Sequence, residues 1–342
     1  MIHGHGNDQY KHQTITADFS SNVWYKGIPD GLEDFLRKEI NSISHYPDPD
    51  AGDLARKIAS LHNIPANKIL VTNGATEAFY LIAQLYEKKN GVIFYPSFAE
   101  YEDACRIFGH NLTFINIKKH ETFIPEKDTS TVWYGNPNNP DGTIIPIEVT
   151  EQFCKNSPDT RFIVDEAYTE ICTTATSAIN LTDKYNNLII VRSMTKAFAI
   201  PGIRIGYIVT SEKIINEIKN IKMPWSVSTL AIKAGEFITK NYHNILPDKN
   251  DILKQSKEFQ NNINHINGFE VTFSDCNFFT VKMQASNSNE LKQYLISNYG
   301  ILIRDASNFR SLDSRYFRIS VQTKENNQML IEALKKWSNE KL

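Results

Sequence analysis

Two stretches decide the fold: residues 162–168, which read Phe-Ile-Val-Asp-Glu-Ala-Tyr, and residues 188–196, which read Leu-Ile-Ile-Val-Arg-Ser-Met-Thr-Lys. Each starts as a short run of β-branched or aromatic residues, which is typical of a buried strand, and ends in charged and hydroxyl side chains. Similar runs recur from about residue 68. The expected strands are residues 69–72, 92–95, 112–117, 132–134, 162–164, 188–191 and 205–209.

Stretches of helical period lie between these strands, at residues 75–86, 99–108 and 147–155, and another follows the last strand at residues 211–221. Strand alternating with helix at this spacing predicts crossover connections and hence a doubly wound, mostly parallel, seven-stranded α/β sheet. Such sheets bind ligands at the carboxyl ends of their strands. A functional site is therefore expected at the strand ends.

The pattern changes after about residue 240, where polar sequence leads into a smaller α+β domain. Its expected helices are residues 252–266, 288–299 and a last one from about 325, and its expected strands are 270–273, 278–282, 301–304 and 316–321. The first 45 residues have few periodic features. We therefore predict an N-terminal arm that also forms part of the small domain (1–45), a large cofactor-binding domain (46–240) and a C-terminal small domain (241–342).

The composition excludes several classes of protein. The 342 residues are 41% hydrophobic and 22% charged, with 37 Lys and Arg against 39 Asp and Glu, a balance that argues against a nucleic-acid partner. No apolar run approaches the roughly 20 residues that a membrane span needs, and the N-terminus has no secretory signal pattern. Four scattered cysteines (105, 154, 172 and 276) fit neither a disulfide framework nor a zinc site. A cytoplasmic protein is expected.

Polar residues follow the first and fourth strands. After the first comes a turn, Asn-Gly-Ala-Thr at 73–76, where the backbone N–H groups of Ala75 and Thr76 would face an anion; a helix cap alone is the alternative. After the fourth, residues 135–143 contain two Asn-Pro steps, which hold an amide at a fixed place unless they serve only as a rigid loop.

The fifth and sixth strands end in charged residues. Asp165 ends a buried strand and needs a cationic or donor partner, although a helix-capping aspartate is equally compatible with this segment. Lys196 follows the sixth strand beside Ser193 and Thr195, shortly before Arg204; a solvated surface lysine is the alternative.

Together these strand ends supply the parts of a pyridoxal phosphate site. The cofactor needs a lysine for its aldehyde, a carboxylate for its pyridine nitrogen, donors for its phenolic oxygen and a cradle for its phosphate. The residues in these roles are Lys196, Asp165, Asn139 with Tyr168, and the turn Gly74, Ala75, Thr76 with Ser193, Thr195 and Arg204. The sequence has neither a dinucleotide fingerprint nor a P-loop.

From about residue 18 to the C-terminus the chain resembles fold-type I pyridoxal phosphate enzymes of the class I/II aminotransferase family. The resemblance implies that Lys196 is the Schiff-base lysine, Asp165 the pyridinium partner, and Asn139 and Tyr168 the phenolate donors. Phe98 falls where the family stacks a ring on the cofactor, with core filling as the alternative. Tyr46 resembles a tyrosine that reaches the neighbouring subunit's cofactor phosphate, which implies a homodimer.

Arginine is scarce, with 10 residues against 27 lysines, yet four of the 10 are Arg304, Arg310, Arg315 and Arg318. Arginine suits carboxylate and phosphate groups, so the cluster indicates anion recognition. Arg318 resembles the family's arginine for the substrate carboxylate, and Arg304 is expected on a neighbouring strand. We expect Arg315 to form a surface ion pair with Asp313, and the role of Arg310 stays open.

Two branches of the family that act on phosphorylated amines are most similar: histidinol-phosphate aminotransferases and threonine-phosphate decarboxylases. Residues 3–7, 18–22, 98–102 and 300–310 resemble the decarboxylases more, although His5 interrupts the usual Gly-Gly pair and residues 23–27 depart from the usual Asn-Pro-x-Gly. The resemblance implies a substrate site that contains His3, Asn22, Arg304 and Arg318. A metal site at His3 and His5 would have too few ligands, so none is expected.

The expected activity is decarboxylation of L-threonine O-3-phosphate to (R)-1-aminopropan-2-yl phosphate in cobalamin biosynthesis. The substrate bond perpendicular to the cofactor ring is the one that breaks, so Arg304 and Arg318, with His3 and Tyr46, would select the reaction by orienting the substrate's anions. An aminotransferase of histidinol phosphate or a related amino acid is the first alternative. A non-catalytic binding or regulatory protein is the second, but it would have no chemical need for Lys196.

Overall fold

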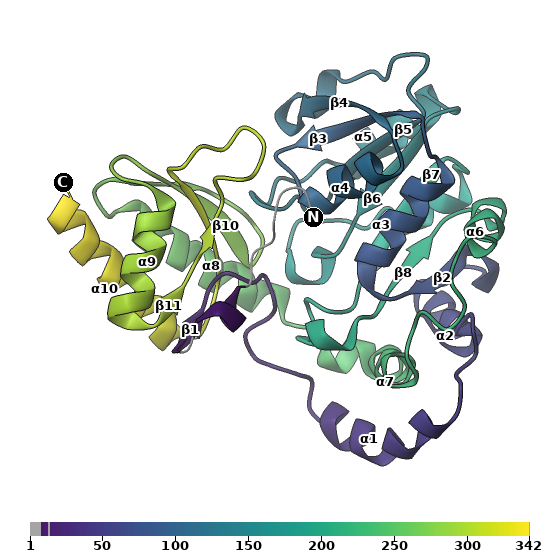
Figure 1. Ribbon diagram of the computed structural model, residues 1–342, viewed down its shortest axis with the longest axis horizontal. Helices are drawn as coiled ribbons and strands as arrows, with labels where there is room; N and C mark the ends of the chain where they lie inside the picture. The colour runs from purple at the N-terminus through teal and green to yellow at the C-terminus, as the bar shows by residue number, and fades with distance from the viewer. Residues whose placement is uncertain (1–7, 13, 342) are drawn as a thin grey trace.

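The computed structural model describes residues 8–12 and 14–341 of the chain. Its centre is a seven-stranded sheet in the order β2-β8-β7-β6-β5-β3-β4 (Figure 1). The strands are β2 (Ile69–Thr72), β3 (Asn90–Tyr95), β4 (Asn111–Asn116), β5 (Thr131–Gly135), β6 (Arg161–Asp165), β7 (Leu188–Ser193) and β8 (Gly206–Val209). Only β8 runs antiparallel, to both of its neighbours. The predicted mostly parallel α/β sheet is therefore confirmed.

Helices cover both faces of this sheet because successive strand residues point to opposite sides. On one face Ile163 and Ile189 pack with α3 (Gly74–Leu85), α4 (Ala99–Ile107) and α6 (Glu212–Lys219). On the other face Phe162 and Ile190 pack with α2 (Gly52–His62), α5 (Ile147–Asn156) and α7 (Thr229–Ile245). We call the sheet with these helices the large unit.

The small unit is built on a four-stranded antiparallel sheet in the order β12-β13-β10-β9. Its strands are β9 (Phe269–Thr272), β10 (Phe278–Met283), β12 (Arg304–Asp305) and β13 (Tyr316–Ser320), and its helices are α8 (Lys249–Asn264), α9 (Ser288–Tyr299) and α10 (Lys324–Lys341). The N-terminal strand β1 (Ala17–Asp18) pairs in parallel with β11 (Ile301–Leu302), and Phe19 lies in the core of this unit.

Two predictions of elements are wrong. The expected strand at 301–304 is two strands, because β11 pairs with β1 whereas β12 pairs with β13 in a different sheet. The first 45 residues do contain a regular helix, α1 (Leu32–Glu39), which packs on α7. The predicted boundary at residue 240 falls inside α7, and the three-domain division stays a prediction.

Short 3-10 helices connect the main elements. They lie at Gln9–Lys11, Ile40–Ser44, Ala66–Lys68, Ile117–Thr122, Thr169–Ile171, Ile179–Asp183 and Pro201–Ile203. In the described ranges 8–12 and 14–341, no helix combines the length and the apolar character that crossing a membrane requires.

Candidate active site

A cavity of about 610 Å³ lies between the two units, at the carboxyl ends of the large sheet's strands. Most of the predicted site residues line it: Asn22, Ala75, Thr76, Phe98, Asn139, Asp165, Tyr168, Ser193, Thr195, Lys196, Arg204, Arg304 and Arg318. Gly74 is not among the lining residues but directly precedes Ala75 in the chain, and Tyr46 is not among them either. His3 lies outside the described residues. The structure thus gathers side chains that the sequence places almost 300 positions apart.

Lys196 follows β7 and lines the cavity with a half-buried side chain. Burial, together with the positive charges of Arg318 and Arg204, lowers the pKa of its amine to about 8, while Asp165 opposes the shift. The backbone carbonyl of Lys196 accepts a hydrogen bond from the Trp24 N–H at 2.9 Å. A substantial fraction of the amine is therefore neutral near pH 7–8, the state that attacks an aldehyde.

Asp165 ends β6 and is buried. Its carboxylate accepts the Tyr101 O–H at 2.5 Å and the Ala167 N–H at 3.0 Å. Burial raises the pKa of this carboxyl group to about 6, although both donors and the charge of Lys196 act in the opposite direction. A cation beside it would therefore be strongly favoured, since the carboxylate is charged at pH 7 in a low-dielectric site.

Tyr101 is a residue that the sequence analysis missed. It is fully buried on α4, and its hydroxyl group holds Asp165 in place. Its spacing could have identified it: Tyr101 follows Phe98 by three positions, and side chains three positions apart share a helix face. Phe98 lines the cavity, with its ring edge-on to those of Phe79 and Tyr101 at 6.4 and 5.9 Å.

The start of α3 forms an anion-binding cradle. Gly74 has φ +72°, which favours glycine, and a Cβ atom there would displace the guanidinium group of Arg204 from its place against the helix. No side chain caps the helix at Asn73, and Ala75 and Thr76 face the cavity. A helix N-terminus beside an arginine is the arrangement that binds phosphate in many proteins.

Two hydroxyl groups extend this cradle from β7. Ser193 Oγ and Thr195 Oγ1 lie 2.8 Å apart, and both residues line the cavity. Each is buried, so the hydroxyl groups are held in place as donors for an anion at the end of α3.

Arg318 connects the small unit to the Asn139 amide of the large one. It donates to Asn139 Oδ1 at 2.5 Å and to the Ser20 carbonyl oxygen at 2.6 Å, while its Nε is buried without a partner among the described residues. Burial lowers the pKa of Arg318 to about 10, and the nearby Tyr168 partly offsets this shift. The group stays charged at neutral pH, and the Asn139 amide nitrogen remains as a donor toward the cavity.

Arg304 lies directly opposite Arg318 in the register of β12 and β13, as the sequence predicted. Its Nη2 donates to Asn308 Oδ1 at 2.7 Å, and its guanidinium carbon lies 5.4 Å from the centre of the Phe309 ring. Burial lowers its pKa, with Asp305 and Asp8 opposing the shift. Two guanidinium groups on paired strands give this wall of the cavity a positive charge suited to anions.

Two further predicted residues have different surroundings. The Asn22 side chain is buried near the Tyr168 hydroxyl group, but no hydrogen bond of normal length and angle satisfies either of its polar atoms among residues 8–12 and 14–341. Such an amide is costly unless a ligand binds it. Tyr46 is 84% exposed, with its ring 5.1 Å from that of Trp225.

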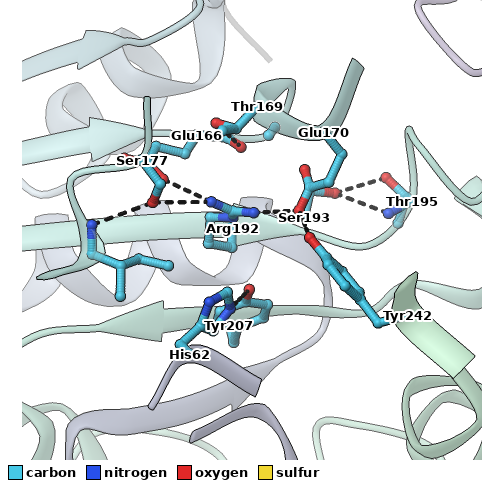
Figure 2. Close-up of polar contacts among 12 residues, drawn as sticks. His62, Glu166, Thr169, Glu170, Ser177, Arg192, Ser193, Thr195, Tyr207 and Tyr242 are labelled. Carbon is cyan, nitrogen blue, oxygen red and sulfur yellow. Dashed lines mark hydrogen bonds and ion pairs between the residues drawn. The ribbon is translucent and has the colours of Figure 1, made fainter. Parts of the chain in front are cut away.

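A buried ion cluster lies behind the strand ends, and sequence reasoning did not identify it. Figure 2 shows Arg192 of β7 between Glu166 with Ser177 on one side and Glu170 with Tyr242 on the other. Arg192 Nη1 lies 2.8 Å from Glu166 Oε2, and Nη2 pairs with Glu170. Because Glu166 follows Asp165 and Arg192 precedes Ser193, the cluster fixes the two strand ends that carry Asp165 and Lys196 relative to each other.

The donor set fits pyridoxal phosphate. Lys196 can bind the aldehyde, Asp165 can pair with the pyridine nitrogen, and Asn139 and Tyr168 can donate to the phenolic oxygen. The cradle at α3 can hold the phosphate, because the glycine at position 74 leaves room for Arg204 and the first-turn residues Ala75 and Thr76 line the cavity.

Comparison with known proteins identifies the family. Residues 13–334 match the family described as aminotransferase class I and II. The crystal structure of L-threonine-O-3-phosphate decarboxylase from Porphyromonas gingivalis is 37% identical, with a TM-score of 0.92 over 94% of this chain and 99% of that one. The crystal structure of the histidinol-phosphate aminotransferase from Clostridium acetobutylicum is 29% identical, with a TM-score of 0.86 over 95% and 99%.

A histidinol-phosphate aminotransferase from Caldanaerobacter subterraneus subsp. tengcongensis is 30% identical over 86% of this chain and 84% of its own length. The family match spans nearly the whole chain, so it includes both units and the cavity between them. The expected family, fold and cofactor are thus confirmed. The chain belongs to the class I and II aminotransferase family and is an enzyme that depends on pyridoxal 5'-phosphate.

Proposed function

We propose that this enzyme removes the carboxylate of a phosphorylated amino acid, with L-threonine O-3-phosphate as the substrate and (R)-1-aminopropan-2-yl phosphate as the product. The observation that carries the proposal is the pair Arg304 and Arg318, which face the same cavity as Lys196 from opposed positions on β12 and β13. A substrate with two anionic groups matches two guanidinium groups. The similar decarboxylase structure, at 37% identity, supports the same choice.

Pyridoxal phosphate, when bound, supplies an electron sink for the pair left by a broken bond at the substrate α-carbon. We assign to Lys196 the attachment of the cofactor aldehyde and the transfer of a proton at its Nζ. Asp165, held by Tyr101, would stabilise a proton on the ring nitrogen. Asn139 and Tyr168 would donate to the phenolic oxygen, and Phe98 would pack against the ring.

The cradle formed by Gly74, Ala75, Thr76, Ser193, Thr195 and Arg204 would hold the phosphate of the cofactor. On the substrate side, Arg304, Arg318 and the unpartnered amide of Asn22 bind the anionic groups, together with His3. By orienting these anionic groups, the residues would decide whether the carboxylate or the α-proton is lost.

The active unit in this proposal is a homodimer, to which Tyr46 contributes across the interface. Its high exposure and its place outside the cavity of its own chain support this role. An apolar hollow of about 660 Å³, lined by α1 and the Pro201–Ile203 turn, lies next to Arg204 along the chain. Burying that hollow against a second copy would bring the copy close to the cofactor phosphate.

The proposed setting is cobalamin biosynthesis in the cytoplasm. All four cysteines are buried and free, which is compatible with a reducing compartment. The pathway follows from the proposed product, because an aminopropanol phosphate is the linker precursor that such a decarboxylase would supply.

A product assay tests the activity. We expect the purified protein with pyridoxal phosphate and L-threonine O-3-phosphate, without a keto acid, to release carbon dioxide and aminopropanol phosphate in equal amounts. Lys196→Ala is the control for chemistry, and L-threonine without the phosphate is the control for recognition. Absence of carbon dioxide under these conditions would rule out the decarboxylase.

An aminotransferase is the second candidate, favoured by the relative of that kind at 30% identity. In that case histidinol phosphate would convert the cofactor to its pyridoxamine form, which is visible in the absorption spectrum, and no carbon dioxide would appear. A non-catalytic protein would do neither and would keep its spectrum unchanged with both substrates.

A further inference from the structure

The loop between β12 and β13, residues 306–315, reaches from the small unit to the large unit at the mouth of the cavity. Arg310 of this loop places its Nη2 3.0 Å from both carboxylate oxygens of Glu102 on α4. Its guanidinium carbon lies 3.6 Å from the centre of the Phe114 ring on β4. All three residues line the cavity. We call the contact among Arg310, Glu102 and Phe114 the rim clasp.

The rim clasp is stronger than an ordinary surface ion pair. The Glu102 side chain is only 10% exposed, and that of Arg310 is 41% exposed, so the pair is partly removed from water. The aromatic ring beneath the guanidinium group adds a cation–π attraction. Partial burial and stacking together make this contact more favourable than an exposed pair, which contributes little.

The clasped loop also holds Arg304. Asn308, two residues before Arg310, accepts a hydrogen bond from Arg304 Nη2 at 2.7 Å. The Phe309 ring, directly before Arg310, lies 5.4 Å from the Arg304 guanidinium carbon. The position of Arg304 therefore depends on a segment whose anchor on the large unit is Arg310.

We propose that Arg310 is a positioning residue for substrate binding. Through the rim clasp it holds residues 306–312 against the large unit, keeps Arg304 directed at the substrate's anionic group, and closes the mouth of the cavity over an amino acid with a second anionic group. Arg310 acts through Arg304 and does not itself bind the substrate, because its guanidinium group is held by Glu102 and stacked on the Phe114 ring. The inference rests on the proposed function, since it takes Arg304 as a ligand of the substrate.

The same loop offers a matched control. Arg315 pairs with Asp313, two residues away, at 2.6 Å, and both side chains are nearly half exposed. This ion pair stays within the loop and reaches neither the large unit nor the cavity lining. The change Arg315→Ala removes an arginine of similar exposure and leaves the residues of the rim clasp unchanged.

Steady-state kinetics of the loaded enzyme give the first test. We expect Arg310→Ala to raise the KM for the phosphorylated substrate roughly five- to tenfold, with kcat changed less than about threefold. Arg310→Lys should recover part of the loss, because it keeps the charge but not the planar group that stacks on Phe114. Arg315→Ala should change KM less than about twofold.

The result also separates this inference from the proposed function. An unchanged KM in Arg310→Ala, with a raised KM in Arg304→Ala, would overturn the rim clasp alone. An unchanged KM in Arg304→Ala would overturn the anion-binding role of Arg304 and the inference with it.

Proteolysis gives a second readout that needs no substrate. Trypsin cleaves after arginine, so the rate of cleavage after Arg310 and Arg315 in the loaded enzyme reports how firmly the loop is held. Glu102→Gln should speed this cleavage roughly threefold or more, because it leaves Arg310 in place and removes the charge of its partner. Arg106→Ala, which removes the other arginine that pairs with Glu102 at 2.7 Å, is the control and should leave cleavage unchanged. Equal rates in wild type and Glu102→Gln would overturn the rim clasp.

Discussion

The two walls of the cavity are built in different ways. The cofactor wall, formed by Asp165, Lys196 and the start of α3, belongs to one sheet whose strands are hydrogen-bonded neighbours. The substrate wall, formed by Arg304 and Arg318, also starts from paired strands, but its guanidinium groups are oriented by contacts with segments far apart, such as Arg318 with Ser20, 298 positions away. Because the sheet fixes the position of the cofactor wall, this wall tolerates little change in its reacting groups. The contacts that orient the arginines of the substrate wall can be changed one at a time.

This comparison predicts the largest effect at Lys196. We expect Lys196→Ala to lower kcat by roughly 10³-fold or more, because no other amine of the described cavity lining can attach the cofactor and move the proton. Steady-state turnover and the cofactor's visible absorption measure this. Lys222→Ala, at a half-buried lysine outside the cavity, should keep activity within about twofold of wild type. A fully active Lys196→Ala protein would contradict the assignment.

A smaller loss is expected at Asp165. The change Asp165→Asn keeps the shape of the side chain and an acceptor for Tyr101, but it removes the negative charge that favours a protonated ring nitrogen. We expect kcat to fall roughly 10²-fold while the cofactor still binds. Tyr101→Phe should produce a smaller loss of the same kind, since it removes only the hydrogen bond. Turnover equal to wild type in Asp165→Asn would contradict the role that we assign to the charge of Asp165.

The substrate wall should respond through KM and to different degrees at its two arginines. Arg318 is buried and hydrogen-bonded to Asn139 and Ser20, so Arg318→Ala should raise KM roughly 10²-fold or more. Arg304 is held by the loop after β12 and is less buried, so Arg304→Ala should raise KM about tenfold. Equal effects at both positions would show that burial does not set their contributions.

The smallest predicted effect concerns pH. The pKa of Lys196 is lowered from 10.5 to about 8, so the amine loses its proton, and becomes able to attack, as pH rises from 7 to 9. We expect the rate at which the cofactor-free protein takes up pyridoxal phosphate to rise over this window, with a midpoint near 8. Stopped-flow absorbance measures that rate. A midpoint near 10.5 would mean that the cavity does not perturb the lysine.

The same pKa shift has a consequence for stability, with a defined sign. Because folding lowers the pKa of Lys196 from 10.5 to about 8, the unfolded state takes up this proton first, so the folded state loses stability as pH falls from about 10.5 to about 8 and loses no more from this group below that.

The cofactor wall could be predicted from the sequence because its residues follow apolar runs that mark buried strands. Asp165 directly ends such a run and Lys196 follows another, so strand order alone brings them together. Even the positive-φ glycine at position 74 lies in the expected turn. The local sequence pattern was enough to predict these residues, because the pairing of the strands brings their ends together.

The contacts between distant segments could not be predicted in this way. Arg310 and Glu102 are 208 positions apart, and no local pattern pairs them. Arg192 was visible beside Ser193, but its two buried partners, Glu166 and Glu170, are known only once β6 and β7 are neighbours. The helix α7 was missed because its polar Asn- and Lys-rich end hides the apolar face that packs on α1 and α2.

The most direct test of the two-wall account measures cofactor affinity and substrate KM in parallel for Arg204→Ala and Arg304→Ala. Arg204 lies against the start of α3, and Arg304 faces the cavity from β12. The account predicts that Arg204→Ala weakens cofactor binding and leaves the substrate KM of the saturated enzyme nearly unchanged, and that Arg304→Ala does the reverse. If both variants weakened cofactor and substrate to the same extent, the division of the cavity into two walls would be wrong.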